Sequence, residues 1–363
     1  MIRSALACMV ALSLAVVASA DQGNPKLKSI EAIRFGPNGL LLIGGGSDAV
    51  TVETGDTKES TWTKTEIPNI DQVLAGKLGL TTKDIEIRRI AVNPASRKIY
   101  VAVRSLKGNQ YAILTIDGAG KVDEFSLDNV KYTKYPLEVG KQAVSKVTDL
   151  TYAGGKIVVA TQAGDVFGSR VFTITPGAKD PFASFSTETY HVGHGKWETK
   201  APIMCLMPYE DGAKTNVIGS FTCTPIVKYS LDDTSPDVKV KGVSVVELGQ
   251  GNQPLSMFPY EKDGKKYILV NVFRKFNKNP VGPSPNWVAK VDFELLKETV
   301  NVNEKALWRV DPKGKASVSV TDRAVVAKDF FGVQHMDKLD DSRAIVVRDT
   351  DKNGLDLKVL ALP

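Results

Sequence analysis

The chain has 363 residues, with 47 lysines and arginines against 41 aspartates and glutamates, for a formal net charge of +6. Both signs are interspersed, there is no basic block, and aromatic residues make up only 7%, so a nucleic-acid-binding surface is not expected. No Cys-x-x-Cys-His motif occurs, which excludes covalent attachment of a c-type haem.

The first twenty residues have the pattern of a secretory signal peptide. Arg3 is followed by an apolar run, and a tripeptide of small residues, Ala-Ser-Ala, ends at Ala20. The apolar run is shorter than the roughly 20 residues that span a bilayer, and no later segment is apolar over that length. We therefore expect residues 1–20 to be removed on export. Residues 21–363 would form one domain, periplasmic or extracellular, without an integral membrane segment.

Short β-strand patterns, bounded by glycine, asparagine, aspartate and proline, recur along the rest of the chain. They are clearest where four apolar or alternating runs are separated by Asn-Pro, Lys-Gly-Asn and Asp-Gly-Ala-Gly turns. These runs cover Ile85–Val92, Lys98–Val103, Gln110–Ile116 and Lys121–Ser126. A unit of strand, polar turn and very apolar strand begins six times, at intervals of roughly fifty to sixty residues.

This repetition predicts an all-β fold, a β-propeller with six blades, because each blade of a propeller packs face to face on the next. Seven blades are the alternative count, since residues 318–328 could hide a degenerate blade. A large β-sandwich would have no reason to restart the same unit. We expect the N-terminal strand region of the mature chain to close the ring against the C-terminal "LDLKVLALP".

One segment departs from the strand pattern. Residues 70–85, "IDQVLAGKLGLTTKDI", place apolar side chains at helical spacing, with Asp71 as the candidate N-cap. This predicts a short amphipathic helix in the connection between the first two blades. The proline-rich residues 277–286 predict a long loop on one face of the propeller, where binding functions are common.

Stretches spread over nearly all of the mature chain carry a family resemblance. They include "FGPNGLLLIGG", "IAVNPASRKIYVAV", "YHVGHGKWETKAP" and "FTCTPIVKYSL". In these stretches the chain resembles a family of exported β-propeller-like proteins common in planctomycetes and related bacteria. The resemblance implies a propeller fold and an exported location, and it implies no particular activity.

The stretch "YHVGHGKWETKAP" contains two of the three histidines, His191 and His194, followed by Glu198. Neutral imidazole binds zinc, copper, nickel or iron, and the glycines flanking His194 would let both rings reach one ion. Cys223 would add a thiolate ligand. We expect these four residues to lie near one another at one face of the central channel, as ligands of a divalent transition metal. The alternative is structural, with both histidines hydrogen-bonded to loop carbonyls and stacked on Trp197.

The two cysteines of the mature chain, Cys205 and Cys223, flank a predicted hairpin turn. Strand pairing about that turn places Cys223 nearest Pro202, and this offset strains a disulfide, which needs Cα atoms about 4.4–6.8 Å apart. An oxidising compartment favours the bond. A disulfide and two buried free thiols therefore both remain open. A nucleophilic role for Cys223 would need a base that the sequence does not identify.

Two functions fit these patterns. The first is a monomeric binding module for a small molecule or a protein, because no acid–base constellation is evident and propellers host many unrelated functions. The alternative is a metal-dependent hydrolase similar to six-bladed gluconolactonase-like enzymes, which hold a divalent cation with Glu, Asn and Asp at the channel. Glu31 and Asp149, on the first strands of their units, are the candidate acids for that alternative.

Export makes a direct prediction about the N-terminus. Sequencing of the exported protein should begin at Asp21, because the Ala-Ser-Ala tripeptide before it is the expected cleavage motif. Recovery from the soluble cytoplasm of a chain that still starts at Met1 would contradict the prediction.

Overall fold

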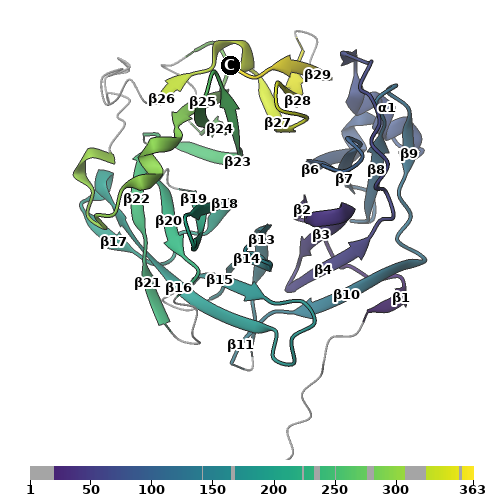
Figure 1. Cartoon of the computed structure of the whole chain (residues 1–363). Coiled ribbons are helices and arrows are strands. Elements are labelled where there is room, and N and C mark those ends of the chain that lie inside the picture. Colours follow the sequence, from purple (N-terminus) through teal and green to yellow (C-terminus); the bar gives the residue numbers. More distant parts are fainter. Residues whose placement is uncertain are drawn as a thin grey trace, which may run out of the picture.

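The computed structural model describes residues 20–140, 142–164, 168–222, 225–232, 238–249, 251–275, 282–306, 324–350 and 354–363. These residues form six sheets, antiparallel apart from one parallel strand pair, arranged as blades around a central axis (Figure 1). The predicted all-β fold and the count of six blades are therefore confirmed. Of residues 318–328, the described part contains a strand that belongs to the fifth blade. No helix among the described residues is long and apolar enough to cross a membrane.

Blades are numbered by the chain order of their innermost strands, and in blades 2 to 5 the four main strands follow one another outwards in chain order. Blade 2 matches the four predicted runs closely, with β6 (Ile85–Val92), β7 (Ile99–Ser105), β8 (Tyr111–Ile116) and β9 (Val122–Glu124). Blade 3 consists of β13 (Lys146–Ala153), β14 (Lys156–Gln162), β15 (Ser169–Ile174) and β16 (Phe182–His191), extended by β17 (Lys196–Glu198) and β21 (Val238–Lys241). Blade 4 consists of β18 (Ile203–Asp211), β19 (Lys214–Phe221), β20 (Pro225–Ser230) and β22 (Val243–Glu247). Blade 5 consists of β23 (Asn252–Lys262), β24 (Lys265–Arg274), β25 (Asn286–Asp292) and β26 (Ala324–Val326).

The other two blades are composite, because each takes an outer strand from a distant part of the chain. Blade 1 consists of β2 (Ala32–Phe35), β3 (Leu40–Gly45) and β4 (Asp48–Glu53), completed by β10 (Val130–Pro136) and β1 (Asp21–Gly23). Blade 6 consists of β27 (Val333–Lys338), β28 (Arg343–Asp349) and β29 (Leu355–Ala361), completed by β5 (Glu66–Ile67). The remaining elements are β11 (Glu138–Val139), β12 (Gln142–Ala143) and the short 3-10 turns η1 (Pro37–Gly39), η2 (Thr82–Asp84), η3 (Val192–His194), η4 (Phe293–Lys297), η5 (Glu304–Ala306) and η6 (Lys328–Phe330).

The order of blades around the axis differs from their order in the chain. The innermost strand of blade 1 packs beside those of blades 2 and 3, and blade 2 packs beside blade 6 (Figure 1). The predicted closure of the N-terminal strand region against "LDLKVLALP" is therefore wrong. The C-terminal strand β29 pairs with β5, which follows blade 1 in the chain, whereas β1 pairs with β10. Blade 2 is held between the first and last blades by these two exchanges.

The hydrophobic core is divided into six clusters, one at each contact between neighbouring blades. The cluster between blades 2 and 6 includes Leu357 of β29, Ile99 of β7 and Trp62, which lies in the segment leading to β5. Each fully buried side chain of this size contributes roughly 1.5–3 kcal/mol to folding. Closure of the ring therefore depends mainly on apolar packing at every contact between blades.

Helix α1 (Ile70–Lys77) confirms the predicted helix between the first two blades of the chain. Its apolar face, with Ile70 and Leu74 buried, joins the cluster between blades 2 and 6. The predicted cap is wrong: the N-cap is Asn69, and Asp71 lies in the first turn, where its carboxylate accepts a hydrogen bond from the backbone N–H of Leu355 at 3.2 Å. The helix therefore fastens the last strand as well as connecting two blades.

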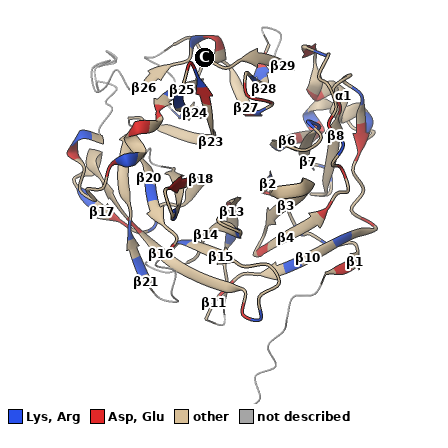
Figure 2. Cartoon of the chain, viewed as in Figure 1, with Lys and Arg blue, Asp and Glu red and all other residues tan. Residues whose placement is uncertain are grey.

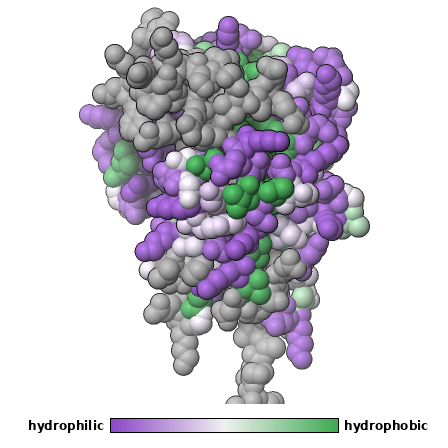
Figure 3. Space-filling view, turned by 90° about the vertical axis from the view of Figure 1, so that its left-hand side faces the viewer, coloured by the Kyte–Doolittle hydropathy of each residue, from purple (hydrophilic) through white to green (hydrophobic). Residues whose placement is uncertain are grey.

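Charged side chains of both signs are distributed around the ring without a single basic face (Figure 2). The side of the molecule that carries the outer strands on the left of Figure 1 is mainly hydrophilic, with scattered hydrophobic side chains (Figure 3).

Packing at the ring closure can be tested with matched leucine substitutions. Leu357→Ala, at a side chain that is 0% exposed, should lower the free energy of unfolding by about 2–5 kcal/mol, because the deletion leaves a cavity between blades 2 and 6. Leu106→Ala removes the same atoms from a side chain that is 52% exposed and should change it by less than about 0.5 kcal/mol. Equal effects in urea denaturation would show that this contact does not hold the ring closed.

Candidate metal centre

Three of the four predicted ligands lie together on one hairpin at the outer edge of blade 3. His191 ends β16, His194 ends η3, and Glu198 ends β17. The register pairs Thr189 with Glu198 and His191 with Lys196, so the side chains of His191 and Glu198 are diagonal neighbours on one face. Gly195 closes the turn between the strands with φ of 63°, a left-handed conformation that glycine adopts readily.

The side chains converge on one point. Nδ1 of His194 lies 2.8 Å from Oε1 of Glu198, and Nδ1 of His191 lies 3.3 Å from Oε2 of the same carboxylate. The two imidazole ring centroids are 4.0 Å apart. One ligand atom from each of the three residues lies within 4.8 Å of the others. The side chain of His191 is only 5% exposed and that of His194 is 42% exposed, so the cluster has one open side.

A fourth residue, Glu247 at the end of β22 in blade 4, supports the cluster from behind. Oε2 of Glu247 lies 3.5 Å from Nε2 of His191. The same carboxylate accepts backbone hydrogen bonds from Val192 at 2.6 Å and from Gly193 at 3.0 Å. The sequence prediction missed Glu247, because nothing separates a single acid at the end of an apolar strand from an ordinary surface residue. The Glu247 carboxylate contacts both the ring of His191 and the backbone of the turn that follows it.

The protonation states suit metal binding. Burial, and then the neighbouring His194, lower the pKa of His191, which keeps its imidazole neutral. Burial opposes ionisation of Glu198, but hydrogen bonds from His194 and His191 hold the pKa of this carboxyl below its usual value. Burial raises the pKa of Glu247 to about 7, against the two backbone hydrogen bonds that it accepts. Neutral imidazoles and an ionised carboxylate are the forms that bind a metal.

The predicted position of the cluster at the channel is wrong. β16 and β17 are the strands of blade 3 farthest from the axis, and β17 lies at the left-hand edge of Figure 1. The prediction assumed that the loop with both histidines leads directly to the innermost strand of blade 4. Instead the chain first forms the β16–β17 hairpin at the rim, and residues 199–202 then lead inwards to β18.

The structural alternative, in which both histidines stack on Trp197 and bond to loop carbonyls, does not match the observed contacts. Trp197 packs edge to face on Tyr190, with 5.6 Å between ring centroids, and the ammonium of Lys241 lies 4.9 Å from the Trp197 ring. The histidines instead pack on each other and bond to carboxylates. A metal-binding histidine usually directs its other ring nitrogen to a partner such as a carboxylate, and Glu247 stands in that position beside Nε2 of His191.

Of the two cysteines, only Cys205 is described. It is a free, fully buried thiol on β18, and its Sγ lies 2.7 Å from Oγ of Ser220. Burial raises the pKa of this thiol to about 12, so it is protonated and inert at neutral pH. This outcome corresponds to the free-thiol alternative for Cys205. Cys223 lies outside the described residues, so its predicted role as a ligand stays a prediction.

The two candidate acids for a channel hydrolase are engaged in ion pairs. Oδ2 of Asp149 lies 3.4 Å from the guanidinium of Arg34 and accepts the backbone N–H of Leu206 at 2.8 Å. Glu31 is paired with Arg88. A cation at either carboxylate would have to displace a guanidinium, so the geometry does not favour a divalent metal at the channel.

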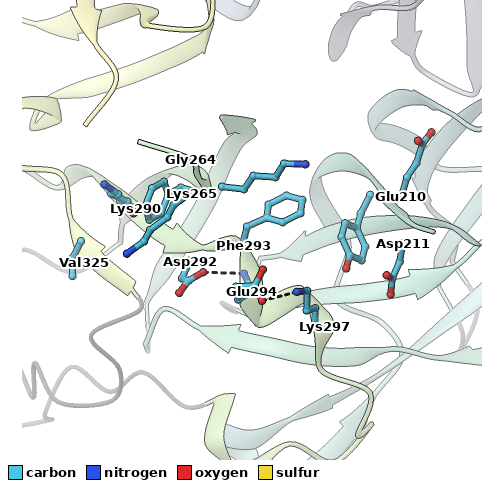
Figure 4. A pocket seen from close by; sticks show the side chains of 13 residues that line it. Glu210, Asp211, Gly264, Lys265, Lys290, Asp292, Phe293, Glu294, Lys297 and Val325 are labelled. Carbon is cyan, nitrogen blue, oxygen red and sulfur yellow. Dashed lines mark hydrogen bonds and ion pairs between the residues drawn. The ribbon is translucent and has the colours of Figure 1, made fainter. Parts of the chain in front are cut away.

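The described residues also form cavities outside this cluster, and two of them matter for function. The larger, about 820 Å³, lies between the outer parts of blades 4 and 5, where four lysines and four acids line it (Figure 4). Lys297 pairs with Glu294 at 2.7 Å, and Asp292 caps the turn at Glu294 N at 2.9 Å. This balance of charge is typical of a solvated cleft. The second cavity, about 570 Å³, lies at the mouth of the channel and is bordered by the first residues of the innermost strands.

Comparison with known proteins gives likeness of fold only. No family model matches the chain, and no curated protein matches it. Drosophila Semaphorin 1b, extracellular domains 1–2, is 12% identical with a TM-score of 0.43, over 96% of this chain and 86% of that chain. The GH43 endo-arabinanase from Bacillus licheniformis is 15% identical with a TM-score of 0.38, over 74% of this chain and 90% of that chain. A luciferin-regenerating enzyme is 12% identical with a TM-score of 0.36, over 95% of this chain and 96% of that chain. Similarity of this degree carries no argument about activity, ligand or partner.

The third histidine, His335, is expected to make the stability of the fold sensitive to acid. Burial, and then the charges of Arg89 and Arg88, lower the pKa of His335 at the channel mouth to about 3. The unfolded chain, with a histidine pKa of about 6.5, therefore binds more protons than the folded chain between these values. This group's contribution to stability is thus full above pH of about 6.5 and decreases as the pH falls towards 3.

His335→Gln should remove that contribution. The difference in unfolding free energy between about pH 7.5 and about pH 5 should shrink by roughly 1–2 kcal/mol in the variant, as measured by urea denaturation. A variant whose stability falls with pH as steeply as that of the parent would contradict a neutral imidazole at this position.

Proposed function

We propose that this chain is an exported binding propeller that holds a divalent transition metal at His191, His194 and Glu198. The observation that carries the proposal is the convergence of two imidazoles on one carboxylate, with His191 oriented from behind by Glu247. Imidazole and carboxylate donors suit Zn²⁺ and also Cu²⁺, Ni²⁺ and Fe²⁺. The likeness to exported planctomycete propellers and the signal-peptide pattern support the exported location.

The spacing of the donor atoms fits a metal after a small adjustment. In tetrahedral zinc sites, with metal–ligand distances of about 2.0–2.2 Å, ligand atoms lie about 3.4 Å from one another. The donor atoms here lie within 4.8 Å, and the two Nδ1–carboxylate distances are 2.8 and 3.3 Å. Metal binding would release the protons held between each Nδ1 and the carboxylate, and the freed lone pairs would then face the ion.

The arrangement leaves room for a ligand. Structural zinc sites use four protein ligands, whereas sites with three protein ligands keep a fourth position for water or a bound molecule. His191, His194 and Glu198 supply three, and the exposed side of His194 opens that position to solvent. A metal here would join the outer hairpin of blade 3 to Glu247 of blade 4 and present one coordination position to a small molecule or protein, with the propeller as a monomer.

Metal content tests the proposal directly. The purified protein, loaded with Zn²⁺ and desalted, should retain about one ion per chain in elemental analysis. The double substitution of His191 and His194 by alanine should abolish retention, because only one of three donors remains. Added Zn²⁺ should raise the melting temperature of the parent and not of the double variant, since an ion that binds only the folded state stabilises it.

Two single substitutions sharpen the result. Glu247→Gln should weaken Zn²⁺ binding about 10- to 100-fold without removing a direct ligand, as expected for a partner that orients a histidine. Lys200→Ala changes an exposed side chain just beyond the hairpin and should leave retention unchanged. Retention by the double histidine variant equal to that of the parent would refute the site.

A further inference from the structure

The innermost strands share an irregularity at the channel mouth. A β-bulge interrupts the pairing of five of them, and the residue left without a partner is Arg88 in β6, Thr148 in β13, Met204 in β18, Leu255 in β23 and Gln334 in β27. In blade 1, the remaining blade, Glu31 precedes β2, and its N–H bonds to the carbonyl of Gly44, which also pairs with Ala32. All six residues line the cavity of about 570 Å³.

The bulges aim side chains and free backbone carbonyls at one place. A bulge leaves one residue out of the ladder and re-aims its side chain, and bulges are frequent beside binding and active sites. Five aligned bulges around one axis therefore form a ring of chemically varied side chains at a cavity. Outside the bulge, the rest of each of these innermost strands pairs regularly.

Arg89, the residue after the bulge in blade 2, forms the floor of this cavity. Its guanidinium reaches across the axis and donates to the carbonyls of two bulged residues, Leu255 at 2.7 Å and Met204 at 3.2 Å. Its Nε–H is buried without an acceptor. By contrast, the nearby guanidiniums of Arg34 and Arg88 are paired with carboxylates of Asp149 and Glu31.

The charge of Arg89 is thus solvated by carbonyl dipoles and by no carboxylate within ion-pair distance among the described residues. A guanidinium has five N–H donors, and two are used here. Lys146 at the rim of the cavity adds a second cation. A half-buried cation with unused donors, at the end of an open cavity, is the arrangement that recognises an anion.

We propose that the channel mouth binds a small anion, a carboxylate or a phosphate, on the guanidinium of Arg89. Arg88, Thr148 and Gln334 on the bulge ring would bond to the polar part of the molecule, and Met204 and Leu255 would contact its apolar part. This goes beyond the proposed function, because none of these residues belongs to the cluster at the rim of blade 3. The test therefore uses the double variant of His191 and His194, so that a metal ion bound at the rim of blade 3 cannot account for anion binding.

Calorimetric titration with three probes tests the proposal. D-glucuronate and D-glucose share a ring and differ in a carboxylate, and inorganic phosphate represents the second source of anionic charge. Binding of glucuronate alone assigns a carboxylate, binding of phosphate alone assigns a phosphate, and binding of both assigns a general anion site. Failure of both anions to bind, or equal binding of glucose and glucuronate, would overturn the proposal.

Variants locate the binding. Arg89→Met should weaken anion binding at least about tenfold, because a charge-assisted hydrogen bond is lost. Should that variant fail to fold, Lys146→Glu at the exposed rim should still weaken binding roughly two- to fivefold by charge reversal. Lys179→Glu makes the same change on the β15–β16 hairpin of the same blade, away from the cavity, and should have no effect. Equal effects of the two lysine variants would overturn the assignment to the channel mouth.

Discussion

Two strand pairings between distant parts of the chain decide whether the ring exists at all. β29 pairs with β5, in the register Leu357 with Ile67, and β10 completes blade 1 by pairing with β4. Ion pairs accompany both, Lys358 with Glu66 at 2.9 Å and Lys131 with Glu53 at 2.7 Å. Because such exposed pairs contribute little, the stabilisation comes from the backbone ladders and the apolar clusters behind them. Without either pairing, blade 2 would lose one neighbour and the axis would open.

The repeated unit of strand, turn and apolar strand is sufficient to predict the blades, because each blade buries the same faces in the same order. The runs Ile85–Val92 and Gln110–Ile116 were located to within a residue for this reason. The order of blades around the axis was not predictable from local patterns. β5 has only two residues, and a two-residue strand has no periodicity that could mark it as the outer strand of blade 6.

The sequence predicts the ligands that lie on one hairpin, but it does not predict the residue that another blade contributes. His191, His194 and Glu198 share one hairpin, so their spacing in the sequence already implied proximity. Glu247 comes from another blade and reaches His191 only through the packing of β22 beside β16. The distance of the hairpin from the axis follows from the strand order of blade 3, in which β16 and β17 lie on the outer side.

The bulges show how a signal can be present in the sequence and still be overlooked. Regular alternation places apolar residues two apart, but Ile87 and Ile90 are separated by two residues, Arg88 and Arg89. The same interval recurs in the other innermost strands, from Val147 to Leu150 for example. Such a slip of one residue keeps both flanking side chains in the core only if the strand bulges between them.

That constraint links folding to recognition at the channel mouth. A bulge gives up a ladder hydrogen bond, and the carbonyls freed at Met204 and Leu255 are the acceptors that make a buried Arg89 tolerable. The guanidinium in turn satisfies carbonyls that would otherwise be buried without donors. Neither feature is stable without the other, so the repeat that builds the blades also concentrates polar backbone and a cation on the axis. The outer hairpin with its histidines shares no side chain with this arrangement, and each can therefore be altered while the other stays intact.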